Sequence, residues 1–236
     1  MPGEIIVREH GQQLDHVGLA VRNLDQGIEY VKELTGVTPD VHPPEKGQPY
    51  QSASVRIAED SFLEILAPNK RHWGFHPLKS ILRSFSKPTL FFWYVATDSF
   101  DDVEKRIKDA GRTIERKVVT EKVDREKHSE YIRSMIGPGF YSIVPNLIEW
   151  KHKSNGPMNE TICPLVHFEL SSPDAENINN FFTAVGINQE VLLGQDRMSL
   201  TLDSPKGKVN FQNEAITISN WKAMSILVKD MLGYYK

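Results

Sequence analysis

Hydrophobic and polar residues alternate near the start of the chain in a pattern that predicts a strand followed by a helix. Residues 14–21 read Leu-Asp-His-Val-Gly-Leu-Ala-Val, which places His16 on the face opposite to the larger apolar side chains. Asn23 then supplies an N-cap for an amphipathic stretch that ends at Gly36. A strand, a capped helix and a glycine stop are therefore expected in this order.

The same order returns twice at nearly equal intervals. A second strand-like stretch with a charged helix occupies 89–111, and a third such pair occupies 164–186. His16, Phe92 and His167 fall at equivalent points of the three copies, 76 and 75 positions apart. Short strand-like runs follow each helix, so each copy predicts a β-α-β-β-β unit. The predicted fold class is α+β, built from these repeated units, the third of them degenerate.

Three further segments complete the predicted domain organisation. A helical patch at 78–85 is an insertion between the first two units, and the polar stretch 154–161 is a linker before the third. At 218–235 apolar residues recur along one face of a helix, which we expect to dock on a sheet. The predicted domains are a pair of units at 14–152 and the third unit with the C-terminal helix at 162–236.

Charge and cysteine content narrow the class of partner and the compartment. The 236 residues carry 28 Lys and Arg against 31 Asp and Glu, a net charge of -3 that gives no electrostatic reason to expect nucleic acid or an anionic membrane as partner. Cys163 is the only cysteine, no secretory signal is recognised, and no apolar run approaches about 18 residues. We expect a cytoplasmic protein without a membrane span that binds a small molecule.

Glutamates stand between apolar neighbours in two predicted strands. In the run Phe-Leu-Glu-Ile-Leu at 62–66, Glu64 shares a face with Phe62 and Leu66. A buried carboxylate without a partner is costly, which suggests a metal, an arginine or a proton-transfer role. The run Asn-Leu-Ile-Glu-Trp at 146–150 repeats the pattern with Glu149. Two such residues in a repeat favour a shared cavity.

These motifs resemble the vicinal oxygen chelate superfamily and, within it, the glyoxalase-like domain family. The resemblance covers about residues 14–152 and is carried by Leu14-Asp-His-Val, Phe62-Leu-Glu-Ile-Leu and Asn146-Leu-Ile-Glu-Trp. The third unit resembles the family more faintly. Membership implies that two units pair, so that their curled mixed sheets enclose a cavity with a divalent metal.

The resemblance also implies a ligand set for that metal. His16 and Glu64 match the two ligand positions of the first unit, and Glu149 matches the carboxylate of the second. Phe92 occupies the second unit's histidine position and cannot bind a metal, a departure from the four ligands of glyoxalase I. The remaining donors suit Mn²⁺, Fe²⁺, Mg²⁺ or Zn²⁺. The metal would chelate two neighbouring substrate oxygens, while a free carboxylate of Glu64 or Glu149 moves a proton.

Five further residues are candidates for substrate contacts. By strand parity Phe92 and Tyr94 share a face and could wall the pocket. Arg56 and Arg133 lie in predicted strands, where a guanidinium that faces the cavity would select a carboxylate or a phosphate. His167 could replace the missing ligand if the third unit reaches the cavity.

Three functions from different classes are compatible with these patterns. The leading one is a metal-dependent enzyme of lyase, isomerase or dioxygenase type that acts on a small oxygenated metabolite. The alternative is a non-catalytic protein of the same superfamily that binds or sequesters a small molecule or drug, which Phe92 favours. The third is a structural module that completes a sheet across the two-fold axis of a homodimer.

Overall fold

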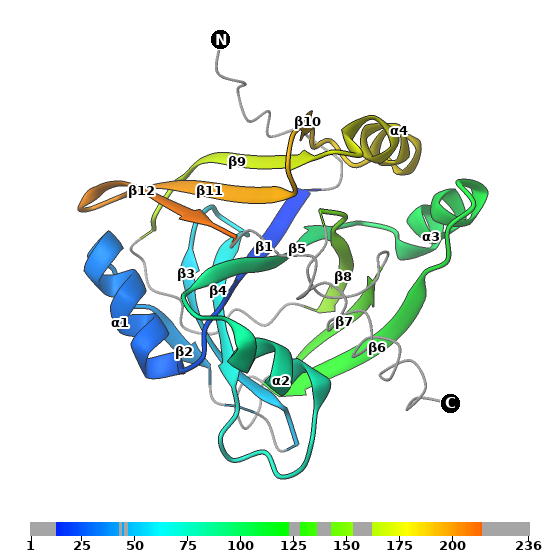
Figure 1. Ribbon diagram of the computed structural model, residues 1–236. Helices are drawn as coiled ribbons and strands as arrows, with labels where there is room; N and C mark the ends of the chain where they lie inside the picture. The colour runs from blue at the N-terminus through cyan, green and yellow to red at the C-terminus, as the bar shows by residue number, and fades with distance from the viewer. Residues whose placement is uncertain are drawn as a thin grey trace.

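The computed structural model describes residues 13–42, 44, 47–122, 128–135, 143–152 and 162–213 (Figure 1). The predicted linker at 154–161 and the predicted C-terminal helix at 218–235 lie outside these residues. In the described part of the chain, every helix is too short or too polar to span a membrane.

Two units of the predicted kind form one eight-stranded sheet, the large sheet. Its strand order is β2-β3-β4-β1-β5-β8-β7-β6. The first unit comprises β1 (Gln13–Ala20), α1 (Leu24–Thr35), β2 (Asp40–His42), β3 (Tyr50–Arg56) and β4 (Phe62–Pro68). The second comprises β5 (Thr89–Ala96), α3 (Phe100–Asp109), β6 (Glu115–Lys122), β7 (His128–Met135) and β8 (Asn146–His152). The predicted α+β class and the repeated β-α-β-β-β order are confirmed.

Helices α1 and α3 begin at residues whose side chains cap them. Asn23 Oδ1 accepts hydrogen bonds from the backbone N–H groups of Asp25 and Gln26, and Ser99 Oγ does the same for Asp102 at the start of α3. Helix α1 ends at Gly36, whose φ of 79° is accessible to glycine at little cost. Local chemistry therefore fixes the helix boundaries in both units.

The first strands of the two units join them. Strand β1 pairs with β5 in antiparallel orientation, with His16 opposite Tyr94 and Gly18 opposite Phe92. On its other edge β1 runs parallel to β4, which places Gly18 beside Glu64. The sheet therefore has an inner face, which carries these residues, and an outer face.

The third unit keeps the element order but pairs its strands differently. It contains β9 (Leu165–Ser172), α4 (Ala175–Val185), β10 (Val191–Leu193), β11 (Arg197–Ser204) and β12 (Gly207–Gln212). These strands form a separate small sheet in the order β10-β9-β11-β12. In the third unit, β9 has strands of its own unit on both sides. It therefore has no free edge for pairing with another unit, whereas β1 and β5 pair with each other through such edges. The third unit therefore packs on the large sheet instead of extending it.

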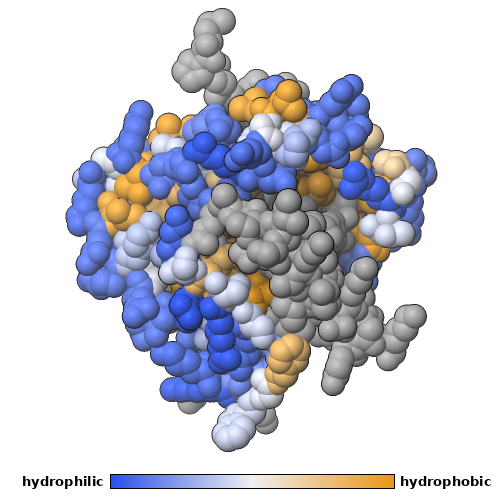
Figure 2. Space-filling view, in the orientation of Figure 1, coloured by the Kyte–Doolittle hydropathy of each residue, from blue (hydrophilic) through white to orange (hydrophobic). Residues whose placement is uncertain are grey.

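Helices and the small sheet cover the outer face of the large sheet, as Figure 1 shows. Trp93, from β5, packs its ring against Phe168 of β9 and Phe182 of α4, at centroid distances of 5.3 and 6.1 Å. Residues of all three units share one buried apolar cluster there. Figure 2 shows mainly hydrophilic side chains on the described surface of one face, with hydrophobic ones in separate patches.

The inner face is covered in part by helix α2 (Pro77–Ser84), the predicted insertion. Its residues Leu78, Ile81 and Leu82 form a second buried cluster with Phe92 and Tyr94. This cluster covers one end of the inner face. His16 and Glu64 are not part of it.

We predict that Trp93→Ala lowers the free energy of unfolding by about 3–5 kcal/mol, because it removes a buried aromatic ring that joins the two sheets. The wild-type chain should unfold in a single transition, since the third unit shares its core with the first two. Thermal unfolding followed by circular dichroism measures both. Two separate transitions in the wild type would contradict the shared core.

Candidate functional site

His16 lies on the inner face between two aromatic rings. Its imidazole stacks on Phe62, at 4.9 Å between ring centroids with an interplanar angle of 5°, and on Tyr94 at 4.4 Å and 18°. Phe92 meets the same ring edge-on at 5.8 Å. The packing holds the imidazole in one orientation, with its two nitrogens pointing to opposite sides of the stack.

Asp15 lies against the Nδ1 side of His16. The carboxylate is 2 % exposed, and its Oδ1 lies 2.6 Å from His16 Nδ1. Its Oδ2 accepts a hydrogen bond from Trp150 Nε1 at 2.7 Å. A carboxylate at Nδ1 favours the tautomer with the proton on that nitrogen, which leaves the lone pair on Nε2.

The sequence analysis missed Asp15, because simple alternation places it on the face opposite to His16. The pairing of β1 with β5 is irregular between Leu14 and His16. Such an irregularity lets two consecutive side chains lie near each other instead of on opposite faces. No residue type in this stretch marks the irregularity in advance.

Glu64 lies on the other side of the imidazole. Its Oε2 is 3.8 Å from His16 Nε2, and its side chain is 18 % exposed. The structure thus brings together two of the three predicted metal donors, His16 and Glu64. The Glu64 carboxylate therefore faces Nε2 of His16, and the Glu64 side chain keeps some exposure to solvent.

Phe92 occupies the position at which the second unit would carry a metal-binding histidine. The ring lies directly over Gly18, where an added Cβ would come within 2.3 Å of a ring carbon. Glycine at this position is therefore required by the ring above it. Phe92 therefore lies on the inner face, next to His16.

Tyr94 and Arg133 meet beside the imidazole. Burial raises the pKa of the Tyr94 phenol above its usual value, while a hydrogen bond from Arg133 acts in the opposite direction. The negative charges of Glu64 and Asp15 also raise this pKa. Tyr94 consequently keeps its proton at neutral pH and can donate it in a hydrogen bond.

Arg56 also lies on the inner face, where its backbone is opposite Phe62. Its Nε is buried and finds no hydrogen-bond acceptor among the described residues. A buried donor left unpaired costs about 1–3 kcal/mol. Both predicted strand arginines therefore lie on the face that carries His16.

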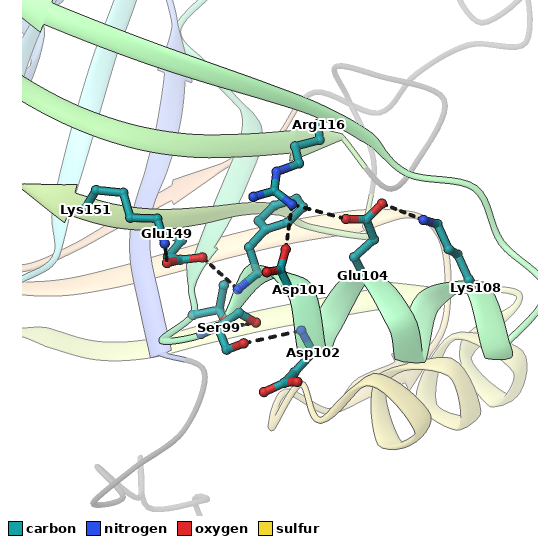
Figure 3. A network of polar contacts seen from close by, with 10 residues as sticks. Ser99, Asp101, Asp102, Glu104, Lys108, Arg116, Glu149 and Lys151 are labelled. Carbon is teal, nitrogen blue, oxygen red and sulfur yellow. Dashed lines mark hydrogen bonds and ion pairs between the residues drawn. The ribbon is translucent and has the colours of Figure 1, made fainter.

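Glu149 is not brought to His16 and Glu64. It lies on the face of β8 turned toward α3, and its Oε2 accepts the backbone N–H of Phe100 at 2.8 Å, while Oε1 pairs with Lys151 (Figure 3). The carboxylate thus stabilises the positive N-terminus of α3. In the described chain no three His, Cys, Asp or Glu side chains form a group that could hold a metal.

Glu149 faces away from His16 because it lies three positions along β8 from the residue that corresponds to Glu64. Gly18 of the first unit corresponds to Tyr94 of the second. Glu64 lies beside Gly18 in the sheet, and Asn146 lies beside Tyr94. Asn146, and not Glu149, therefore occupies the position equivalent to Glu64. An odd offset along a strand turns the side chain to the opposite face.

His167 lies away from the inner face. It is exposed on the small sheet, with its Nε2 3.4 Å from Glu169 Oε2, and its neighbour Phe168 points into the core shared with the large sheet. Because the small sheet covers the outer face of the large sheet, the third unit does not deliver His167 to His16.

A pocket of about 310 Å³ opens beside this site, at the ends of β1, β5 and β8. Asp15 and Trp150 reach it from the inner site, and the residues that line it are Gln13, Asp15, Asp60, Ala96, Thr97, Asp98, Glu149 and Trp150. His16 and Glu64 do not line it, so the pocket adjoins the His16 site without containing it.

The sequence over residues 14–186 matches the glyoxalase-like domain family. The chain belongs to this family, and with it to the vicinal oxygen chelate superfamily. No curated protein matches the chain.

Solved structures with a similar arrangement of helices and strands have low sequence identity to this chain. A hypothetical protein from Staphylococcus aureus shares the fold, with a TM-score of 0.54 and 10% identity over 86% of this chain and 85% of its own. An Mn(II)-bound glyoxalase from Novosphingobium aromaticivorans gives a TM-score of 0.47 at 10% identity, over 89% and 84% of the two chains. Methylmalonyl-CoA epimerase from Mycobacterium tuberculosis gives 0.43 at 16%, over 61% and 93%.

We predict that Gly18→Ala lowers the free energy of unfolding by about 1–3 kcal/mol, because the new methyl group overlaps the Phe92 ring. Phe92→Leu should relieve the overlap, so the double variant should lose less stability than the two single losses added together. Urea unfolding of the four proteins measures this difference. Simple additivity would show that the ring does not constrain Gly18.

We predict that Glu149→Gln destabilises the protein by about 1 kcal/mol, because the N-terminus of α3 loses its negative partner. Lys151→Met is the matched control, since it removes the exposed partner of the same ion pair and leaves the contact with Phe100. Thermal unfolding should show a larger loss for Glu149→Gln than for Lys151→Met. The reverse order would contradict the helix role.

Proposed function

We propose that the protein is a metal-dependent enzyme of lyase, isomerase or dioxygenase type that acts on a small oxygenated metabolite. The observation that carries this proposal is the chain of contacts Asp15–His16–Glu64. A histidine that donates Nδ1–H to a buried carboxylate and directs Nε2 at a second carboxylate has the arrangement of a metal-ligating imidazole.

The donor set fits an ion held by two protein groups. His16 Nε2 and Glu64 Oε2 are 3.8 Å apart. A small movement of the two side chains would let both atoms bind one metal ion at ordinary bond lengths. Mg²⁺ and Mn²⁺ take oxygen-rich sets completed by water and substrate, whereas a structural Zn²⁺ needs four protein ligands. Such an ion would polarise two neighbouring oxygens of the substrate.

The surrounding residues have separate roles in this proposal. Asp15 holds the tautomer of His16, and the rings of Phe62 and Tyr94 hold its orientation. The Tyr94 hydroxyl keeps its proton, because its pKa is raised, and donates a hydrogen bond to a substrate oxygen. Glu64 would hold the ion through Oε2, and its second carboxylate oxygen would be left to accept or return a proton.

A second candidate function is the non-catalytic binding of a small aromatic molecule. It is favoured by Phe92, which fills the position of a further donor and adds a third ring around His16. In that case Phe62, Phe92 and Tyr94 would be the binding surface, and no metal would be needed.

We predict that the untagged protein contains Mn or another divalent metal in near-stoichiometric amount and loses it in His16→Ala and in Glu64→Gln. Asp15→Asn should weaken metal binding about 10- to 100-fold, because it removes the group that orients the ligand. Elemental analysis and calorimetric titration with Mn²⁺ provide the measurement.

Glu149→Gln is the matched control for this experiment. It removes the same charge from a carboxylate that lies on the outer face, so its metal content should equal that of the wild type. Wild-type protein that stays free of metal after incubation with these ions would overturn the enzyme proposal. Chelator-insensitive binding of an aromatic ligand would then support the second candidate.

A further inference from the structure

We propose that the His16 site binds its substrate through an anionic oxygen group, a carboxylate or a phosphate, held by Arg56. This inference rests on the proposed function for the reaction and names the chemical class of the substrate. The substrate would be a small oxygenated acid whose reacting oxygens lie near Glu64.

The position of Arg56 in the sheet supports this role. Arg56 lies opposite Phe62, Phe62 stacks on His16, and His16 stacks on Tyr94. Arg133, which hydrogen-bonds to Tyr94, stands at the other end of this row. The inner face thus carries a line of aromatic rings centred on the imidazole, with a guanidinium at each end.

The distance along this row suits a metabolite. Arg56 lies two strands away from His16, which corresponds to about 10 Å between their backbones. An arginine side chain covers much of that distance, so its guanidinium can approach a molecule that reaches the Nε2 of His16. A substrate with its acidic group a few bonds from its reacting oxygens would span both.

The buried Nε of Arg56 is an unfilled donor. A structural arginine is normally paired with a carboxylate or with carbonyl oxygens, and among the described residues Nε has no acceptor. The two nearby carboxylates are committed elsewhere, since Asp15 bonds His16 and Trp150, and Glu64 faces His16. An anionic oxygen group would supply the missing acceptor with the geometry that a guanidinium prefers.

The charge of the site points to the same class of ligand. The two arginines carry two positive charges against the two carboxylates of Asp15 and Glu64 on the inner face. A divalent ion at His16 and Glu64 would leave an excess of positive charge. An anionic substrate would neutralise this excess, whereas a neutral one would not.

The test is a titration of chelator-treated protein with oxalate, inorganic phosphate and oxamide, the neutral diamide that matches oxalate in shape. Spectra of the ¹⁵N-labelled protein report the Nε–H signals of the arginines. Removing metal beforehand ensures that chelation by oxalate makes no contribution. We expect saturable shifts of the Arg56 signal with one of the two anions and none with oxamide. The anion that binds distinguishes a carboxylate from a phosphate site.

Two variants decide whether Arg56 is responsible. Arg56→Gln should weaken anion binding at least 10-fold without lowering the unfolding temperature, because its Nε has no acceptor to lose. Arg112→Gln is the matched control, since this arginine lies over Phe181 of α4, away from the inner face. It should leave anion binding unchanged.

Equal anion affinity in Arg56→Gln, equal shifts with oxamide, or no binding of either anion would each overturn the inference. A lower unfolding temperature of Arg56→Gln with unchanged anion binding would show that Arg56 is structural. Because metal is absent from the titration, failure of the metal proposal would leave the Arg56 result readable by itself.

Discussion

The antiparallel pairing of β1 with β5 is the constraint on which both the fold and the site depend. It joins the two units into one sheet and sets His16 opposite Tyr94 and Gly18 opposite Phe92. The same register turns Trp93 to the outer face, where it packs against the third unit. One set of backbone hydrogen bonds thus positions the imidazole on one face and the core that stabilises it on the other.

The two units contribute unequally to the site. The first supplies the groups with chemistry, Asp15, His16 and Glu64. The second has Phe92 and Asn146 at the corresponding positions and supplies rings and a guanidinium instead. A symmetric scaffold therefore encloses an asymmetric site, in which donors from one unit face a wall from the other.

Much of this architecture could be predicted from local sequence patterns, because caps, glycine stops and alternation act over a few residues. Asn23 and Gly36 mark the ends of α1 in the structure as in the sequence, whereas the meeting of His16 and Glu64 was expected from the family resemblance. Features that depend on pairing between distant strands could not be read in this way. The irregularity at Asp15, the offset that turns Glu149 outward and the central place of β9 all depend on which strands pair and in which register.

The buried carboxylate of Asp15 links the stability of the fold to the chemistry of the site. A carboxylate that is 2 % exposed requires partners for both oxygens, and it finds them in His16 of its own strand and in Trp150 of β8. Trp150 belongs to the second unit, so one of the two partners of the Asp15 carboxylate is in place only when the two units are joined. The orientation of the His16 ring also depends on the second unit, because Tyr94 of β5 stacks on it. The paired fold therefore holds in place the polar groups that the first unit contributes to the inner face.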